Sequence, residues 1–149
     1  MYALRIFRAE DKDFWVALHH EAYRPRVEPI WGWDVALQRN FVQTEIDTRY
    51  DGQFVIVVDG GDAGYLSYAW KNDELYVSNI IMRHEWRGKG IGERVMRDLM
   101  GWAARLGKNV FLRTFENNPA KAFYERLGFV VYEHNASDHH YYLRWCPPR

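Results

Sequence analysis

The fold is decided by residues 80–92, whose sequence is Ile-Ile-Met-Arg-His-Glu-Trp-Arg-Gly-Lys-Gly-Ile-Gly. They begin inside an apolar run, Leu75–Met82, that is typical of a strand in the interior of a sheet. The alternate glycines of residues 87–92 let the backbone curl, so that successive N–H groups point at one place. A helix that follows the turn adds free N–H groups and the positive end of its dipole. The stretch predicts a diphosphate site to which Arg87 and Lys89 can add charge; the alternative is a tight turn without a ligand.

Two common phosphate-binding motifs do not fit this stretch. A dinucleotide fingerprint needs G-x-G-x-x-G, whereas the glycines here follow G-x-G-x-G with Glu93 next. A P-loop needs G-x-x-x-x-G-K-[ST], which the chain lacks. The glycine turn alone is therefore a weak indication of function, and the rest of the chain has to identify the ligand.

Hydrophobic periodicity and turn residues on both sides of this turn predict an alternation of strands and helices. Pro25, Pro29 and Gly32 are expected to form a loop between the first two helices. The order β-α-α-β-β-β-α-β-α-β-β predicts an α/β fold with a mixed sheet and helices on both faces. Strands are expected at residues 2–8, 54–58, 65–70, 75–82, 110–114, 130–133 and 141–145, and helices at 11–23, from the N-cap Asp34 to Ile46, at 91–106 and at 119–127.

Length and composition narrow the class of protein. A chain of 149 residues fits one domain, which we expect to span residues 1–149. Twenty Lys and Arg balance twenty Asp and Glu, and a neutral chain is unlike a nucleic-acid binder. The lone Cys146 excludes an internal disulfide and a cysteine-rich zinc site. Without an apolar run of membrane-spanning length or a signal peptide, we expect a cytoplasmic protein that has no membrane partner.

A second motif, residues 117–129, has the sequence Asn-Asn-Pro-Ala-Lys-Ala-Phe-Tyr-Glu-Arg-Leu-Gly-Phe. With it the chain resembles the GCN5-related N-acetyltransferase (GNAT) superfamily. Residues 87–92 match that family's pyrophosphate loop, [RQ]-x-x-G-x-[GA], and the second motif matches N-x-A-x-x-F-Y-E-x-L-G-F. One long helix and one strand separate the two motifs, as in the family, and the strong resemblance covers residues 74–129.

The resemblance implies a mostly antiparallel mixed sheet whose two central parallel strands, 75–82 and 110–114, splay apart to admit acetyl-CoA as cosubstrate. It implies that Tyr124 lies near the thioester sulfur as a catalytic residue. The cofactor-binding residues are those whose backbone pairs with the pantetheine arm, those whose N–H groups hold the pyrophosphate, and polar residues of the second motif. They are Ile80, Ile81 and Met82; Arg87, Gly88, Lys89, Gly90, Ile91 and Gly92; and Asn118, Lys121 and Tyr124.

The implied activity is transfer of an acetyl group to a primary amine of a small molecule or peptide by direct attack. The alternative is an acyl-CoA binding or sensing domain without catalysis. Two glutamates that related members use as bases are absent, since Arg113 and Tyr76 stand at those positions. His20, Glu21 and Glu116 are the remaining candidates for a base, although each fits a solvated surface residue as well.

The acceptor side is expected to come from the first two helices and the loop between them. Tyr23, Trp31 and Trp33 are the candidates there, with packing of the two tryptophans as the alternative. Asn79 is expected to face the same way as Val77 and Ile81, and either to orient the substrate or to satisfy strand-edge groups. No metal site is expected, because adjacent histidines do not have ligand spacing. The expected partner is an amine substrate, on a monomer or a homodimer.

Overall fold

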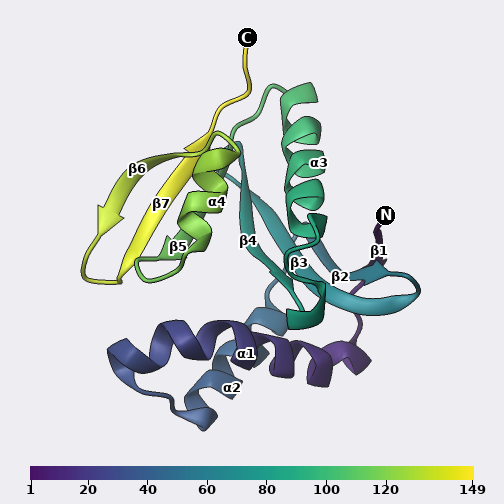
Figure 1. The fold of residues 1–149 in the computed structure, drawn as a ribbon, viewed down its shortest axis with the longest axis vertical. Helices are drawn as coiled ribbons and strands as arrows, with labels where there is room; N and C mark the ends of the chain where they lie inside the picture. Colours follow the sequence, from purple (N-terminus) through teal and green to yellow (C-terminus); the bar gives the residue numbers. More distant parts are fainter.

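A computed structural model describes all residues 1–149 of the chain (Figure 1). It confirms the predicted order of elements and the α/β class. Two short 3₁₀ segments, Ala9–Asp11 and His84–Trp86, are added to that order. The strands and helices are β1 (Ala3–Ile6), α1 (Lys12–Trp31), α2 (Val35–Asp47), β2 (Gly52–Val58), β3 (Gly61–Lys71), β4 (Glu74–Met82), α3 (Ile91–Arg105), β5 (Val110–Phe115), α4 (Ala120–Arg126), β6 (Val130–Asn135) and β7 (His140–Trp145).

The sheet has the order β1-β2-β3-β4-β5-β7-β6, and only β4 and β5 run parallel. These two central strands pair through Leu75 with Val110 and Tyr76 with Phe111, and through no further residues. Beyond Tyr76 they diverge, while β5 continues to pair with β7 as far as Phe115. The expected splay is therefore present, and Figure 1 shows β4 and β5 separating toward α1 and α2.

The two faces of the sheet carry cores of very different size. One cluster of 17 buried residues joins the sheet to α3 and α4, with Val95, Met96 and Leu99 on the buried side of α3. The opposite face, covered by α1 and α2, has a cluster of only four, Trp15, Leu18, Val42 and Tyr65 (Figure 1). Burial of apolar surface is the main stabilising term in folding, so the α1/α2 face contributes less of it. The space that a larger core would fill is a cavity, described below.

The prediction of a loop at Pro25, Pro29 and Gly32 is wrong for the two prolines, because α1 continues through both of them and ends at Trp31. A proline lacks an N–H group and leaves the carbonyl four residues earlier without a partner. Pro25 and Pro29 both lie on the exposed side of α1, where water can serve the freed carbonyls. The helix ends at Gly32, which has a φ of 76° and donates its N–H to Glu28 O at 2.9 Å.

Asn79 faces the same way as Ile81, as expected, but a β-bulge at Ser78 separates it from Val77. Ser67 on β3 pairs with Asn79, but the next residue, Tyr68, pairs with Val77, so Ser78 is an extra residue on β4. The bulge shifts the alternation of side chains between the two faces. Val77 therefore lies in the large core on the α3 side, while Asn79 contacts side chains of α1 and α2. A strict period of two could not predict this change.

Candidate functional site

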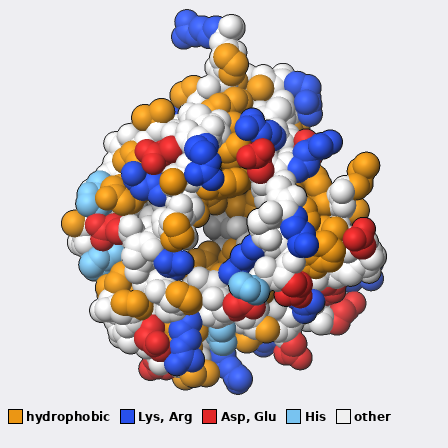
Figure 2. Space-filling model, viewed as in Figure 1, with side chains coloured by type: hydrophobic (Ala, Val, Ile, Leu, Met, Phe, Trp, Pro, Cys, Tyr) orange, Lys and Arg blue, Asp and Glu red, His pale blue; other side chains and the backbone are white.

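A cavity of about 860 Å³ lies where β4 and β5 separate, and α1 and α2 close its other side. Residues 76–81 of β4 and 112–115 of β5 form two of its walls. Figure 2 shows the molecule hollowed near the centre of the face viewed in Figure 1. A cavity of this size is within the range of small-molecule and cofactor sites. The splayed strands thus open onto a recessed space between the sheet and the helices.

The turn before α3 presents free backbone donors, as its glycines predict. Gly88 and Gly90 have φ values of 73° and 79°, in the left-handed region that glycine adopts without strain. The N–H groups of residues 88–92 donate no hydrogen bond within the protein. A Cβ added at Gly88 or Gly90 would meet no atom within 4 Å, so the turn is open on its outer side. Such a cluster of N–H groups at the start of a 15-residue helix can hold an anion.

The two charged side chains of the turn already have contacts within the protein. Arg87 donates from Nε to Met82 O at 3.0 Å and pairs through Nη2 with Glu21 Oε1 at 3.1 Å. Lys89 lies with its Nζ 5.8 Å from the centre of the Trp86 ring. Glu21 is thereby held at the outside of the turn and does not line the cavity.

The edge of β4 that faces β5 is unpaired after Tyr76. Arg83 donates its N–H to Ala63 O on β3 at 2.7 Å. Backbone groups of a strand alternate between its two edges, so those of Met82 and Ile80 face the open edge and those of Ile81 face β3. Of the three residues predicted to pair with an extended ligand, Ile80 therefore presents main-chain groups to the gap. Met82 does so too, although its carbonyl already accepts a hydrogen bond from Arg87 Nε.

The second motif forms α4 and its entrance. Asn118, just before the helix, accepts the N–H of Ala120 through Oδ1 at 2.9 Å, and its Nδ2 has no partner. Asn118 lines the cavity, whereas Lys121 lies outside it. Lys121 contacts Glu125 at 3.4 Å, with its Nζ 5.0 Å from the centre of the Tyr141 ring.

Tyr124 lines the cavity from α4. Its ring packs at 5.2 Å from Phe123 and 5.8 Å from Phe129, and its hydroxyl makes no hydrogen bond within the protein. Burial raises the pKa of Tyr124 to about 12, so the hydroxyl keeps its proton at neutral pH. The cavity therefore contains a free O–H donor.

The acceptor-side candidates Tyr23 and Asn79 are brought together in the cavity wall. The Tyr23 hydroxyl donates to Asn79 Oδ1 at 2.5 Å, and Asn79 Nδ2 donates to Ser67 Oγ at 3.2 Å and to Glu45 Oε1. Trp31 also lines the cavity, at its exposed rim. Trp33 does not; its ring packs against His20, with centroids 5.2 Å apart, and against the guanidinium of Arg24.

Glu45 is the residue that the sequence analysis missed. It reaches the cavity from α2, where its carboxylate also accepts from Ser67 Oγ at 3.4 Å. Burial raises the pKa of this carboxyl, against the opposing effect of its hydrogen bonds with Tyr50, Ser67 and Asn79. His20 and Glu116 do not line the cavity, although Arg113 and Tyr76 do. A helical stripe at i, i+4 and i+7, Gln38, Val42 and Glu45, was the available signal.

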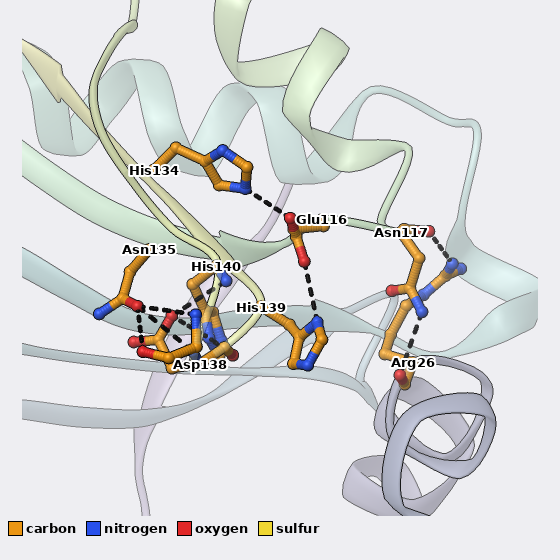
Figure 3. Close-up of polar contacts among 9 residues, drawn as sticks. Arg26, Glu116, Asn117, His134, Asn135, Asp138, His139 and His140 are labelled. Atoms are coloured by element: carbon orange, nitrogen blue, oxygen red, sulfur yellow. Dashed lines mark hydrogen bonds and ion pairs between the residues drawn. The ribbon is translucent and has the colours of Figure 1, made fainter.

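Polar contacts join the rim of the cavity across elements distant in sequence (Figure 3). Arg26 of α1 donates to Asn117 O at 2.5 Å, and Asn117 Nδ2 donates to Arg26 O at 3.1 Å. Glu116 contacts His134 and, at 2.9 Å, His139 Nδ1 from the β6–β7 hairpin. These contacts tie the second half of α1 and the hairpin to the end of β5, which closes one side of the cavity. No group of three or more His, Cys, Asp or Glu side chains could hold a metal ion.

Known proteins resemble this chain in sequence and in fold. The sequence profile described as the acetyltransferase (GNAT) family matches residues 10–129. "Uncharacterized N-acetyltransferase YobR" of Bacillus subtilis is 39% identical over 70 residues, which are 46% of this chain and 27% of that protein. The chain spans 60% of the length of each of two further curated relatives. None of the helices has the length and apolar character needed to cross a membrane.

Two solved structures share the fold at low sequence identity. PH1933 from Pyrococcus horikoshii OT3 has a TM-score of 0.78 at 15% identity, with 100% of both chains covered. The PaiA N-acetyltransferase from Thermoplasma acidophilum, crystallised in complex with coenzyme A, has a TM-score of 0.73 at 12% identity, covering 98% of this chain and 99% of that one. Identities this low show the fold alone.

Proposed function

This chain belongs to the acetyltransferase (GNAT) family, and from that premise we propose that it transfers the acetyl group of acetyl-CoA to a primary amine of a small molecule or peptide by direct attack. One observation carries the proposal. The free N–H groups of residues 88–92 and the unpaired edge of β4 lead, along one continuous side of the gap, to a cavity that contains the Tyr124 hydroxyl.

The N–H groups of Gly88, Gly90 and their neighbours would hold the pyrophosphate. The open edge at Ile80 and Met82 would pair with the pantetheine arm, and the free Nδ2 of Asn118 can donate to the same arm. These are backbone or neutral amide donors, which suits an anionic diphosphate and an amide-rich chain. Arg87 and Lys89 would add positive charge near the turn rather than direct contacts, because Arg87 is engaged with Met82 O and Glu21.

The chemistry that acetyl-CoA supplies is an acetyl group on a good leaving group. Tyr124 would donate its proton to the departing thiolate, since burial keeps the hydroxyl protonated and no protein acceptor competes for it. A free N–H on the open edge of β4 can hydrogen-bond to the oxygen on which negative charge develops. The amine would enter from the side of Tyr23, Trp31 and Asn79.

Thiol release from acetyl-CoA in the presence of primary amines tests the proposal. A suitable panel contains hexylamine, 2-phenylethylamine and a tripeptide with a free N-terminus. We expect thiol to form only when an amine is present, with one acetylated amine per thiol by mass spectrometry. Coenzyme A binding without amine-dependent turnover would identify a binding or sensing domain instead. The N-acetyltransferase relatives do not favour that alternative.

A further inference from the structure

Three carboxylates that no motif of the family assigns line the cavity, those of Asp34, Glu45 and Asp138. Asp34 accepts the N–H of Leu37 at the start of α2, and Asp138 accepts from Tyr142 and from the N–H of His140. Glu45 on α2 is the one in contact with Asn79 of β4. We infer that Glu45 receives the ammonium group of the acceptor and takes the proton that the amine must lose before it attacks. This inference rests on the proposed N-acetyltransferase function, and gives that function a base from a helix rather than from the two central strands. The two strand positions that carry glutamates in related proteins hold Arg113 and Tyr76 here.

The position of Glu45 relative to the sheet supports the role. Its Oε1 accepts from Asn79, and Asn79 directly precedes Ile80, the first residue of β4 whose backbone faces the open gap. The Ser78 bulge turns Asn79 toward α1 and α2, which brings it within reach of Glu45. The carboxylate therefore lies beside the part of the gap where the proposed acyl group and the amine would meet.

The hydrogen-bond partners of Glu45 are all neutral groups. Asn79 Nδ2 and Ser67 Oγ both donate to Oε1, and Tyr50 also forms a hydrogen bond with the carboxyl. A largely buried carboxylate without an ion-pair partner next to a cavity is costly unless it is protonated or paired with a cation. An ammonium ion is the cation that the proposed reaction brings to this place. Glu45 thus selects a positively charged acceptor as well as deprotonating it.

Each candidate base from the sequence lies in a less suitable place. Glu21 is paired with Arg87 outside the cavity, and Glu116 is held between His134 and His139 at the rim. His20 does not line the cavity. His19 does line it, but burial lowers its pKa to about 4, so it is a poor proton acceptor at neutral pH.

The pH dependence of Glu45 is set by groups from every surrounding element. Tyr23 and His19 approach from α1, Tyr50 from the segment after α2, Tyr65 from β3, Tyr76 from β4 and Arg113 from β5. Tyr23, Tyr50 and Tyr65 are neutral near pH 7, because burial raises their pKa values. Arg113 is the only permanent charge among these groups, and it opposes the rise in the pKa of Glu45.

The proton balance of the reaction is complete with these residues. Glu45 takes one proton from the ammonium, and the freed electron pair on nitrogen forms the C–N bond at the thioester carbonyl carbon. The C–S bond breaks, and its electron pair leaves with sulfur, which takes the Tyr124 proton. Tyr124 regains a proton from the nitrogen, so one of the three ammonium protons reaches the thiol and one stays in the amide. The third passes from Glu45 to water.

Glu45→Gln tests the role with little change in shape, since the amide oxygen can still accept from Asn79 and Ser67. With hexylamine at pH 7, we expect kcat/KM to fall about 100-fold or more, the usual effect of losing a general base. The loss should shrink as the pH approaches the amine pKa of about 10, where solvent deprotonates the amine. Glu45→Asp should recover part of the rate. Asp47→Asn is the matched control, because Asp47 is exposed on the same helix and outside the cavity; its rate should stay near wild type.

A defect in Glu45→Gln that is the same at every pH would indicate a structural role and overturn the inference, as would an unchanged rate. If the wild-type protein acetylates none of the panel amines, the proposed function fails and this role fails with it. If it does acetylate them and Glu45→Gln acetylates them equally well, only the role of Glu45 fails.

A measurement on the protein alone gives an independent readout. In carbon-13 NMR spectra of the glutamate side-chain carboxyls, the signal that disappears in Glu45→Gln is that of Glu45. We expect it to titrate above the ordinary glutamate range, and to shift when hexylamine is added. A signal that titrates in the ordinary range and does not respond to hexylamine would contradict the proposed contact.

Discussion

The two sides of the gap between β4 and β5 are built in different ways. The turn before α3 offers backbone N–H groups from five consecutive residues, 88–92, which are free because a helix starts there. The acceptor side is made of side chains from α1, α2, β3 and β4, held together by Tyr23, Glu45, Ser67 and Asn79. The first side is local in sequence and independent of side-chain identity apart from glycine. The second exists only after α1 and α2 pack on the sheet.

This difference predicts that a negative charge added to the turn weakens coenzyme A binding strongly. An uncharged side chain of the same size should weaken it much less. Gly90→Asp and Gly90→Asn place side chains of equal size at a φ of 79°, which both residues tolerate better than most. Neither Cβ would meet a protein atom within 4 Å. The Asp variant should lose coenzyme A affinity by about 100-fold or more, because like charges in contact cost several kcal/mol. The Asn variant should lose much less.

Calorimetric titration with coenzyme A measures both affinities, and circular dichroism checks that the variants are folded. Equal affinities for the Asp and Asn variants would mean that no phosphate group lies against residue 90. The turn would then be a structural connection between β4 and α3 without a role in binding coenzyme A.

The second prediction concerns the point where the two sides meet. Tyr124→Phe keeps the ring that packs on Phe123 and Phe129 but removes the unpaired hydroxyl. Loss of general-acid help should lower kcat by about 100-fold, because the hydroxyl acts only as charge develops on sulfur. The affinity for acetyl-CoA should stay within a few-fold. A wild-type kcat, measured where chemistry limits the rate, would leave Tyr124 as a packing residue.

The third prediction concerns the acceptor side, where the buried His19 should lower the free energy of unfolding at acidic pH. Burial lowers the pKa of His19 to about 4 from an ordinary value of 6.5. As the pH falls, the His19 ring is therefore protonated in the unfolded chain before it is protonated in the folded protein. Below about pH 6.5 the unfolded state gains protons that the folded state resists, and stability must fall as the pH drops toward 4. His19→Phe should remove about 1–3 kcal/mol of that loss.

Urea unfolding at pH 7 and pH 5 measures this slope, with His84→Gln as the control because His84 is exposed. The control should keep the wild-type change in unfolding free energy between the two pH values. If His19→Phe also keeps it, the histidine is protonated in the folded state and the α1 side of the cavity is wetter than its contacts indicate.

The smallest expected effect separates the two tryptophans of the α1–α2 connection. Trp31 lines the cavity rim and packs edge-on to His139 with ring centroids 5.2 Å apart, whereas Trp33 packs outside on His20. Trp31→Ala should raise the KM for an amine about five-fold, the value of one aromatic contact of roughly 1 kcal/mol, with kcat unchanged. Trp33→Ala should change this KM less. A larger effect from Trp33 would place the acceptor on the other side of α1.

The same contrast explains what the sequence could predict. The strand, the glycine turn, the long helix and α4 follow from local patterns, whereas the splay of the two central strands was expected only from the resemblance to the GNAT superfamily. The two prolines of α1 led to the wrong expectation of a loop. Whether a helix continues through Pro25 depends on whether that side of the helix is exposed, and this is decided by tertiary packing. The position of Asn79 depends on the bulge at Ser78.

Glu45 was overlooked for a related reason. A glutamate near the end of an amphipathic helix is usually exposed, and only the packing of α2 over the bulged part of β4 buries this one. Its spacing from Gln38 and Val42 did place it on the buried stripe, and a polar residue on such a stripe is a candidate for a buried role. Side chains that meet from four elements cannot be assembled from spacing alone.

A crystal structure with bound coenzyme A would show whether the two sides of the gap serve one reaction. We expect the pyrophosphate at the N–H groups of residues 88–92, the pantetheine arm between β4 and β5, and the sulfur within hydrogen-bond reach of the Tyr124 hydroxyl. The carboxylate of Glu45 should remain open to the space beyond the sulfur. Coenzyme A bound outside the gap, or a sulfur turned away from the cavity, would contradict the account.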